Sequence, residues 1–373
     1  MRPGGRLLID GRALEGHSGV RGIGTYLRGL LGGLSGLGVT GGVDLLLHRG
    51  RALPDEARRL GVAGSASVPG VKRRLQPVLD PLLVIPALRG HTLYHAVEWA
   101  QPLRSRIPVV VTVHDLIPFL FPDWYPWLRR ERLLALRQLR HADAVIAVSR
   151  CTADDAVRLG RVDPRRITVV HHGVGPAHRP AGEDTVERVL AARAVRRPYL
   201  LAVGTHDDRK RIEVVARVAA QARSDHGAEL VIVGDQGVYA PRVAAAVAAA
   251  GIAGSTRMLG FVDAAELAAL YTAAGCVVYP SAYEGFGLPL LEAMACGAPV
   301  AAFRNSALPE VAGDAALLVE DGDAAAMAAA VSWLLGEPAE RERRAAAGRD
   351  RAAGFTWARS AAAHLDVYRR LGW

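Results

Sequence analysis

Two glutamates frame a glycine-rich turn in the segment Glu284-Gly-Phe-Gly-Leu-Pro-Leu-Leu-Glu292, which follows an apolar run ending at Tyr279-Pro280. Gly285 and Gly287 let the backbone pass close to a ligand, and the helix expected after them offers free N–H groups to an anion. A carboxylate on that helix can accept hydrogen bonds from two adjacent hydroxyls, as on a ribose. The pattern favours a ligand with both anionic and hydroxyl groups. The alternative is a strand–turn–helix with a capping glutamate.

A second cluster of charged residues follows another apolar run, in Val203-Gly-Thr-His-Asp-Asp-Arg-Lys-Arg211. It places Arg209, Lys210 and Arg211 at the expected start of a helix, where the helix dipole disfavours cations. Cations at such a position suggest a multiply negative ligand such as a diphosphate. An exposed basic turn is the alternative interpretation.

Short apolar runs alternate with helical patterns in both halves of the chain, and a helix is expected from about Thr25. This alternation implies parallel sheets with right-handed crossovers, so each half is predicted to be a doubly wound α/β domain. Ligands of such sheets bind at the carboxyl ends of the strands, where both charged segments fall. The predicted strands span residues 6–10, 108–113, 144–148, 167–170, 198–203, 229–233, 276–279, 299–302 and 316–319.

The order and spacing of these motifs resemble the retaining glycosyltransferases of family 4 over nearly the whole chain. Further matching segments are Thr112-Val-His-Asp-Leu-Ile117, Gly260-Phe-Val262 and Ala293-Met-Ala-Cys-Gly-Ala-Pro-Val300. The resemblance implies the GT-B fold, in which two Rossmann-like domains face a cleft. We expect an acceptor-side domain at 1–176, a donor-binding domain at 177–354, and a helix at 355–373 that packs back on the first domain.

The resemblance also implies roles for individual residues. Three match catalytic positions: His114 at the reaction centre, Lys210 on the donor diphosphate and Glu284 near the transferred sugar. The matching donor-binding residues are Gly22, Arg209, Val262, Phe286, Gly287, Leu288 and Glu292, with Glu292 on the ribose and the Val262 backbone on the nucleobase. Two departures from the family pattern are Thr205, where many members have arginine, and Arg211, where many have asparagine.

Two further groups of residues have weaker signals. Asp115 and Trp124 are candidates for contacts to the acceptor or sugar, although Trp124 also suits the packing of a helix. Asp321-Gly-Asp323 resembles the metal-binding Asp-x-Asp of other glycosyltransferases, but its position beyond the donor loops favours a turn and helix cap. We therefore expect no metal ion and no cofactor, the nucleotide sugar being a substrate.

The expected function is retaining transfer of a hexose from a nucleotide-diphosphate sugar to an unidentified acceptor, such as a lipid-linked saccharide or a small molecule. The resemblance favours mannose from GDP-mannose. The alternatives are a UDP-sugar-dependent transferase and a nucleotide-sugar epimerase on the same architecture. A dinucleotide oxidoreductase is disfavoured because Gly19 to Gly24 has the spacing GxxGxG instead of GxGxxG.

Composition restricts location and partners. The three cysteines form no CxxC, and no apolar run is long enough for a secretory signal or a membrane span, so a cytoplasmic protein is expected. Residues 1–180 carry 26 Lys and Arg against 14 Asp and Glu, a net +12, whereas residues 181–373 carry 20 against 23, a net −3. This asymmetry argues against a nucleic-acid binder. The stretch Lys72-Arg-Arg74, followed by Leu75, Val78, Leu79, Leu82 and Leu83, suits peripheral contact with an anionic inner-membrane face or an ordinary helix.

Overall fold

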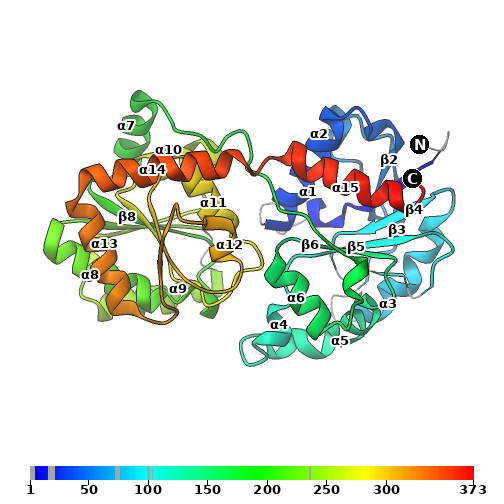
Figure 1. Cartoon of the computed structure of the whole chain (residues 1–373), viewed down its shortest axis with the longest axis horizontal. Coiled ribbons are helices and arrows are strands. Elements are labelled where there is room, and N and C mark those ends of the chain that lie inside the picture. Colours follow the sequence, from blue (N-terminus) through cyan, green and yellow to red (C-terminus); the bar gives the residue numbers. More distant parts are fainter. Residues whose placement is uncertain (1–4, 16–21, 72–75, 99–100, 103, 235–236) are drawn as a thin grey trace. The chain divides into compact units, whose positions relative to one another are not determined.

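The computed structural model describes residues 5–15, 22–71, 76–98, 101–102, 104–234 and 237–373 (Figure 1). The chain divides into two compact units. Unit 1 comprises Met1–Gly173 and Phe355–Trp373, and unit 2 comprises Val174–Gly354. Unit 1 is therefore assembled from two segments that are far apart in the sequence.

Unit 1 contains a parallel seven-stranded sheet with the order β3-β2-β1-β4-β5-β6-β7. Along β1, Leu7 and Ile9 join one buried apolar cluster while Leu8 joins another, so both faces of the sheet are covered. The strands are β1 (Leu7–Asp10), β2 (Val43–His48), β3 (Gly64–Val68), β4 (Leu93–Ala96), β5 (Val109–Val113), β6 (Ala144–Ala147) and β7 (Ile167–Val169). The helices are α1 (Gly22–Gly36), α2 (Asp55–Arg59), α3 (Gln76–Leu83), α4 (Ile117–Leu120), α5 (Pro126–Leu139), α6 (Arg150–Arg158) and α15 (Trp357–Arg370).

Unit 2 contains a parallel six-stranded sheet with the order β10-β9-β8-β11-β12-β13. Its central strands are buried along their whole length and mostly apolar, and helix α13 packs beside α8. The strands are β8 (Tyr199–Val203), β9 (Glu229–Val233), β10 (Thr256–Gly260), β11 (Cys276–Tyr279), β12 (Val300–Phe303) and β13 (Leu317–Val319). The helices are α7 (Glu183–Ala192), α8 (Ile212–His226), α9 (Ala240–Ala249), α10 (Ala264–Ala273), α11 (Leu288–Ala295), α12 (Leu308–Ala312), α13 (Ala324–Gly336) and α14 (Pro338–Ala353).

The two sheets share one topology, which confirms the prediction of two doubly wound α/β domains. In unit 1 the strand order reverses between β1 and β4, and in unit 2 it reverses between β8 and β11. Ligands of open α/β sheets bind outside the carboxyl ends of the strands at such a switch point. A ligand site of unit 2 is therefore expected in the loops that follow β8 and β11.

Helix α15 lies against α1 within unit 1, although the two come from opposite parts of the sequence (Figure 1). The contact requires glycine on α1. A Cβ at Gly29 would lie 2.1 Å from the Trp357 ring, and one at Gly33 would lie 2.4 Å from the Trp357 carbonyl oxygen. Thr356 caps α15 by accepting a hydrogen bond from the Arg359 backbone N–H at 3.2 Å.

A chain of buried hydrogen bonds joins α15 to α1. His364 Nδ1 lies 2.7 Å from the Ser360 carbonyl oxygen, which only accepts, so this nitrogen carries the proton and donates. Burial lowers the pKa of His364 to about 4, so the ring is neutral at pH 7 and Nε2 is an acceptor. The Tyr26 hydroxyl, 2.8 Å from that nitrogen, therefore donates to it.

The same reasoning fixes the direction of the remaining bonds. The Tyr26 hydroxyl already donates its only proton to His364, so Thr112 donates to the Tyr26 oxygen at 2.9 Å. His95 Nε2 then donates to Thr112 Oγ1 at 2.7 Å, and the Tyr368 hydroxyl donates to His95 Nδ1 at 2.7 Å. This series of hydrogen bonds begins and ends on α15, and its donors all point in one direction through β4, β5 and α1. It requires both histidines to be neutral.

The predicted membrane-facing stretch falls partly outside the described residues, because Lys72, Arg73, Arg74 and Leu75 are not among them. In the described part, α3 contains Pro81, and Leu82 is half exposed. Asp80 points inward and accepts a hydrogen bond from the buried Arg12 at 2.9 Å. Within the residues that the structure describes, no helix is long and apolar enough to cross a membrane.

Candidate active site

The loops after β8 and β11 meet at the switch point of unit 2. The Ala282 backbone N–H donates to the Arg209 carbonyl oxygen at 2.8 Å and joins the two loops. Lys210 Nζ donates to Glu284 Oε1 at 2.7 Å and to the Tyr279 hydroxyl at 2.8 Å. Arg209 Nη1 donates to the second Glu284 oxygen at 2.7 Å. Two cations and a glutamate that the sequence motifs singled out are thus held in one cluster.

Electrostatics keep this cluster ionised. Burial raises the pKa of Glu284, but Arg209 and Lys210 outweigh burial and hold that pKa at about 2. Burial lowers the pKa of Lys210, and Glu284 opposes the change. Asp207, whose carboxylate lies 3.6 Å from Arg209 Nε, adds a second negative charge. The formal charges of the four side chains cancel, so an incoming anion must compete with Glu284 for the two cations.

Helix α11 begins directly after this cluster and supplies a further attraction for anions. Gly287 precedes it with a φ of +97°, a left-handed conformation that favours glycine, and a Cβ there would lie 2.9 Å from Leu308 Cδ2. The Glu284 backbone N–H donates to Ser306 Oγ at 2.9 Å, which fixes the turn. Phe286 is buried within the turn, and Leu288 opens the helix. The positive end of α11 thus lies at the carboxyl edge of the sheet.

Glu292 lies one turn into α11 and is largely buried. Burial raises the pKa of its carboxyl group, whereas His178 lowers it. His178 Nε2 is 3.7 Å from Glu292 Oε1. Val262, expected at the nucleobase, is buried just beyond the carboxyl end of edge strand β10. These residues share the sheet edge that carries Lys210.

In unit 1, His114 follows β5 at the carboxyl edge of the sheet. Its Nε2 lies 3.0 Å from the Val97 carbonyl oxygen, so Nε2 carries the proton and Nδ1 is left as the acceptor of the neutral ring. Burial lowers the pKa of His114 to about 4, against the opposing effect of the Val97 bond. The Tyr26 ring packs edge-on against the imidazole, with centroids 4.7 Å apart. His114 therefore presents a hydrogen-bond acceptor at neutral pH.

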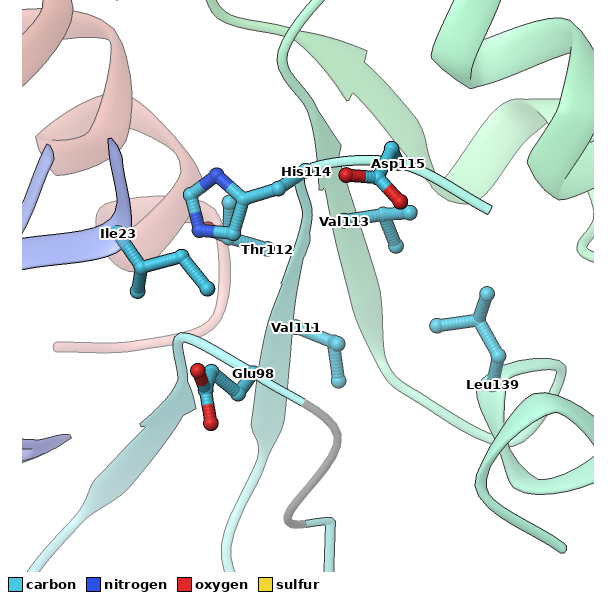
Figure 2. Close-up of a pocket in the computed structure, with 8 residues that line it drawn as sticks. All are labelled: Ile23, Glu98, Val111, Thr112, Val113, His114, Asp115 and Leu139. Atoms are coloured by element: carbon cyan, nitrogen blue, oxygen red, sulfur yellow. The ribbon is translucent and has the colours of Figure 1, made fainter. Parts of the chain in front are cut away.

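A small cavity adjoins His114 (Figure 2). It holds about 70 Å³, and its lining includes Ile23 of α1, Glu98 after β4, and Asp115 beside His114. This volume exceeds the roughly 10–15 Å³ that one water molecule needs, so the cavity has room for more than one.

Three further predicted residues also lie in unit 1. Gly22 is exposed at the first position of α1, so the helix starts three residues before the expected Thr25. Asp115 accepts a hydrogen bond from the Ile117 backbone N–H at 3.1 Å. Trp124 stacks on Phe121, with ring centroids 4.2 Å apart, as expected if it serves packing.

The Asp-x-Asp segment of unit 2 has structural roles. Asp323 caps α13 by accepting a hydrogen bond from the Ala326 backbone N–H at 2.8 Å, as predicted. Asp321 accepts hydrogen bonds from Arg211 at 2.6 Å and from Asn305 at 2.8 Å. The third cation of the basic motif, Arg211, is therefore drawn away from Lys210 to a surface pair.

Comparison with known proteins assigns the family. The model for "Glycosyltransferase Family 4" matches residues 20–178, and that for "Glycosyl transferases group 1" matches residues 187–351. The O-antigen chain mannosyltransferase B of Escherichia coli is 30% identical over 297 residues, which cover 76% of each chain. The chain is a family 4 glycosyltransferase.

Solved structures agree on the fold of this glycosyltransferase. Sucrose-phosphate synthase from Thermosynechococcus elongatus superposes with a TM-score of 0.80 at 23% identity, covering 98% of this chain and 99% of the other. Anabaena Alr3699/HepE, solved in complex with UDP and glucose, gives a TM-score of 0.77 at 17% identity, with the same coverage. The two sheets of seven and six strands thus form the GT-B fold.

Sequence reasoning missed three residues that the structure adds to the sites of this glycosyltransferase. Tyr279 was assigned only to a strand, yet its hydroxyl accepts from Lys210. Glu98 follows β4 at the same sheet edge as His114, and its position after a strand was the available signal. His178 contacts Glu292 from a segment distant in sequence, for which no local pattern exists.

Proposed function

We propose that this glycosyltransferase transfers mannose from GDP-mannose with retention of anomeric configuration and without a metal ion. The observation that carries the proposal is the Arg209–Lys210–Glu284 cluster at the unit 2 switch point, beside the positive end of α11. Cations and a helix terminus at that point suit a diphosphate. Glu292, farther along α11, suits the ribose hydroxyls.

The chemistry follows from where charge develops. The bond between the anomeric carbon and the phosphate oxygen breaks, and its electron pair goes to that oxygen. Lys210 and the α11 terminus stabilise this new charge in a buried setting, which lowers the barrier to transfer. The acceptor hydroxyl attacks on the face that the diphosphate leaves, and its proton passes to the departing phosphate. For His114 of unit 1, we propose that the Nδ1 of its neutral ring accepts a hydrogen bond from a substrate hydroxyl.

Two donors compete in this proposal. The E. coli relative is named a mannosyltransferase, which supports mannose, whereas the HepE structure contains UDP, which supports a UDP-sugar as the second candidate. None of the relatives and solved structures named above is an epimerase. A thermal-shift panel of GDP, UDP and ADP separates the candidates, because a ligand at 100 times its Kd stabilises the fold by about 2.7 kcal/mol. Release of nucleoside diphosphate on adding an acceptor then tests transfer itself; release without any acceptor would contradict it.

Glu292→Ala is expected to weaken donor binding by about 1–3 kcal/mol, because the ribose hydroxyls lose their acceptor. Glu284→Gln is expected to lower kcat, because Glu284 is placed near the transferred sugar, without weakening donor binding. Glu284 holds both cations, and its neutral replacement frees them for the diphosphate. Steady-state kinetics with varied donor distinguish the two effects. A kcat loss confined to Glu292→Ala would show that the two roles are reversed.

Activity is expected to survive excess EDTA, because Lys210, Arg209 and the α11 terminus supply the positive charge that a divalent cation supplies elsewhere. The measurement is turnover before and after chelation, followed by addition of Mg²⁺ or Mn²⁺. Loss on chelation with recovery on metal addition would contradict metal independence and direct attention to Asp321 and Asp323.

For the acceptor, we propose a lipid-linked saccharide reached from the cytoplasm, with peripheral binding of residues 72–83 to an anionic bilayer. The support is the excess of basic residues in 1–180 and the exposed Leu82. We expect the protein to cosediment with anionic vesicles. Salt should weaken this binding, and so should changing Lys72, Arg73 and Arg74 to serine. No sedimentation with anionic vesicles would favour a small soluble acceptor.

A further inference from the structure

The segment after Val174 carries a histidine into the donor site of unit 2. The backbone N–H of His178 donates to the Gly175 carbonyl oxygen at 3.0 Å and closes a turn. Three residues later, the Ala181 N–H donates to Thr272 Oγ1 on α10 at 3.0 Å. These bonds on both sides of His178 fix the backbone that presents its side chain to α11.

The His178 ring reaches Glu292 without bonding to it. Their side chains are 11% and 13% exposed, and the 3.7 Å between Nε2 and Oε1 exceeds a hydrogen bond. An oxygen atom placed about 2.9 Å from each of these two atoms fits this separation and completes hydrogen bonds to both. One hydroxyl group that lies beside the pair can therefore contact both atoms.

Two other buried polar atoms in this region have no hydrogen-bond partner within the described residues. They are His178 Nδ1 and the Tyr271 hydroxyl on α10. The Glu292 charge acts on Tyr271, where it adds to burial in raising the pKa of the phenol. A buried polar group without a partner destabilises a protein by about 1–3 kcal/mol, so such a concentration points to a polar ligand that supplies the missing bonds.

We infer that His178 is a further donor-binding residue that, together with Glu292, holds the ribose diol of the nucleotide sugar. The inference rests on the proposed function. A carboxylate only accepts hydrogen bonds, so Glu292 takes the hydroxyl protons and leaves the hydroxyl oxygens without a donor. His178 Nε2–H supplies that donor to one of them. The pair thereby selects ribose over deoxyribose, because a deoxy donor lacks the bridging oxygen.

The test compares affinities for ribose and deoxyribose ligands. Calorimetric Kd values are measured for GDP and UDP, and for their 2′-deoxy and 3′-deoxy analogues, with the native chain and with His178→Phe. Phe keeps a ring of similar size and removes both nitrogens. Its expected effect is about tenfold weaker binding of the preferred ribonucleotide and no change for one deoxy analogue, so that selectivity collapses.

Two further variants extend the test. His178→Gln keeps a donor near the Nε2 position and is expected to restore part of the selectivity. If His178→Phe fails to fold, an equal loss of affinity for all ligands in His178→Gln overturns the inference. His226→Phe is the matched control, because His226 ends α8 and bonds Ser332 at 3.0 Å. An unchanged or uniformly reduced affinity in His178→Phe overturns the role of His178. If neither nucleotide binds the native chain, the proposed function fails, and the inference fails with it.

Discussion

Lys210→Ala is expected to lower kcat by about two to three orders of magnitude, the scale seen when one preorganised partner of a developing oxyanion is removed. Lys210 is buried and bonds both Glu284 and Tyr279, so its ammonium group is fixed before the donor binds. The variant leaves Glu284 paired with Arg209 alone. Single-turnover kinetics at saturating donor measure the loss free of binding effects.

Arg211→Ala is the matched control for Lys210. Arg211 is the next residue and carries the same charge, but it pairs with Asp321 at the surface, and exposed pairs contribute about 0–1 kcal/mol. Turnover within a few-fold of the native value is expected. Thermal melts of Lys210→Met, which keeps much of the side-chain volume, separate a folding defect from a catalytic one. Near-native turnover in folded Lys210→Met would exclude the diphosphate role.

Lowering the pH from 7 to 4 is expected to destabilise unit 1 before unit 2. Folding lowers the pKa of His364 from the ordinary 6.5 to about 4, so the unfolded chain binds a proton more readily. The stability from this neutral histidine is fully present above pH 6.5 and is lost as the pH falls towards 4, a total of about 3 kcal/mol. Burial also holds the pKa of His95 and of His172 well below 6.5, which increases the loss.

Unit 2 has fewer such groups among the described residues: burial lowers the pKa of His206 to about 3, so the stability from this histidine is also lost below pH 6.5. The buried carboxylate of unit 2 responds at lower pH. The pKa of Glu284 falls from 4.5 to about 2 on folding, so its contribution is present above pH 4.5 and is lost only between 4.5 and 2. Urea unfolding monitored at pH 7, 5.5 and 4 tests the difference. His364→Gln cannot gain the proton, so its stability is expected to depend less steeply on pH between 7 and 4. An equal slope in the variant would contradict the assignment.

The central strands follow from sequence because they are long apolar runs: the predicted strand at 198–203 is β8, and that at 229–233 is β9. Four strands did not follow. Strands β3 (Gly-Ser-Ala-Ser-Val) and β10 (Thr-Arg-Met-Leu-Gly) lie at sheet edges and carry little apolar signal. In β2 and β4, Asp44 and His95 interrupt the apolar pattern, and their partners Arg6 and Tyr368 are recognisable only in the folded chain.

The candidate site was predictable where its residues lie together in one loop motif. Glycine, cations and glutamates after predicted strands led to Lys210 and Glu284, because the carboxyl ends of parallel strands converge. The same reasoning did not reach the ion pair between them, since its partners are 74 residues apart in sequence. It also grouped Arg211 with Lys210 on adjacency alone, whereas the left-handed backbone of Arg211, at a φ of +46°, turns the chain there.

The two-segment make-up of unit 1 bears on how the protein is synthesised. Domains of nascent chains generally fold in order from the N-terminus. Here the core around Tyr26 and Leu30 includes Trp357, Leu365 and Tyr368. The earlier segment of unit 1 must therefore wait, with part of its apolar surface uncovered, until residues 355–373 have been translated. Unit 2, which is continuous, can complete its core in the meantime, so we expect the order of folding to be reversed relative to the order of translation.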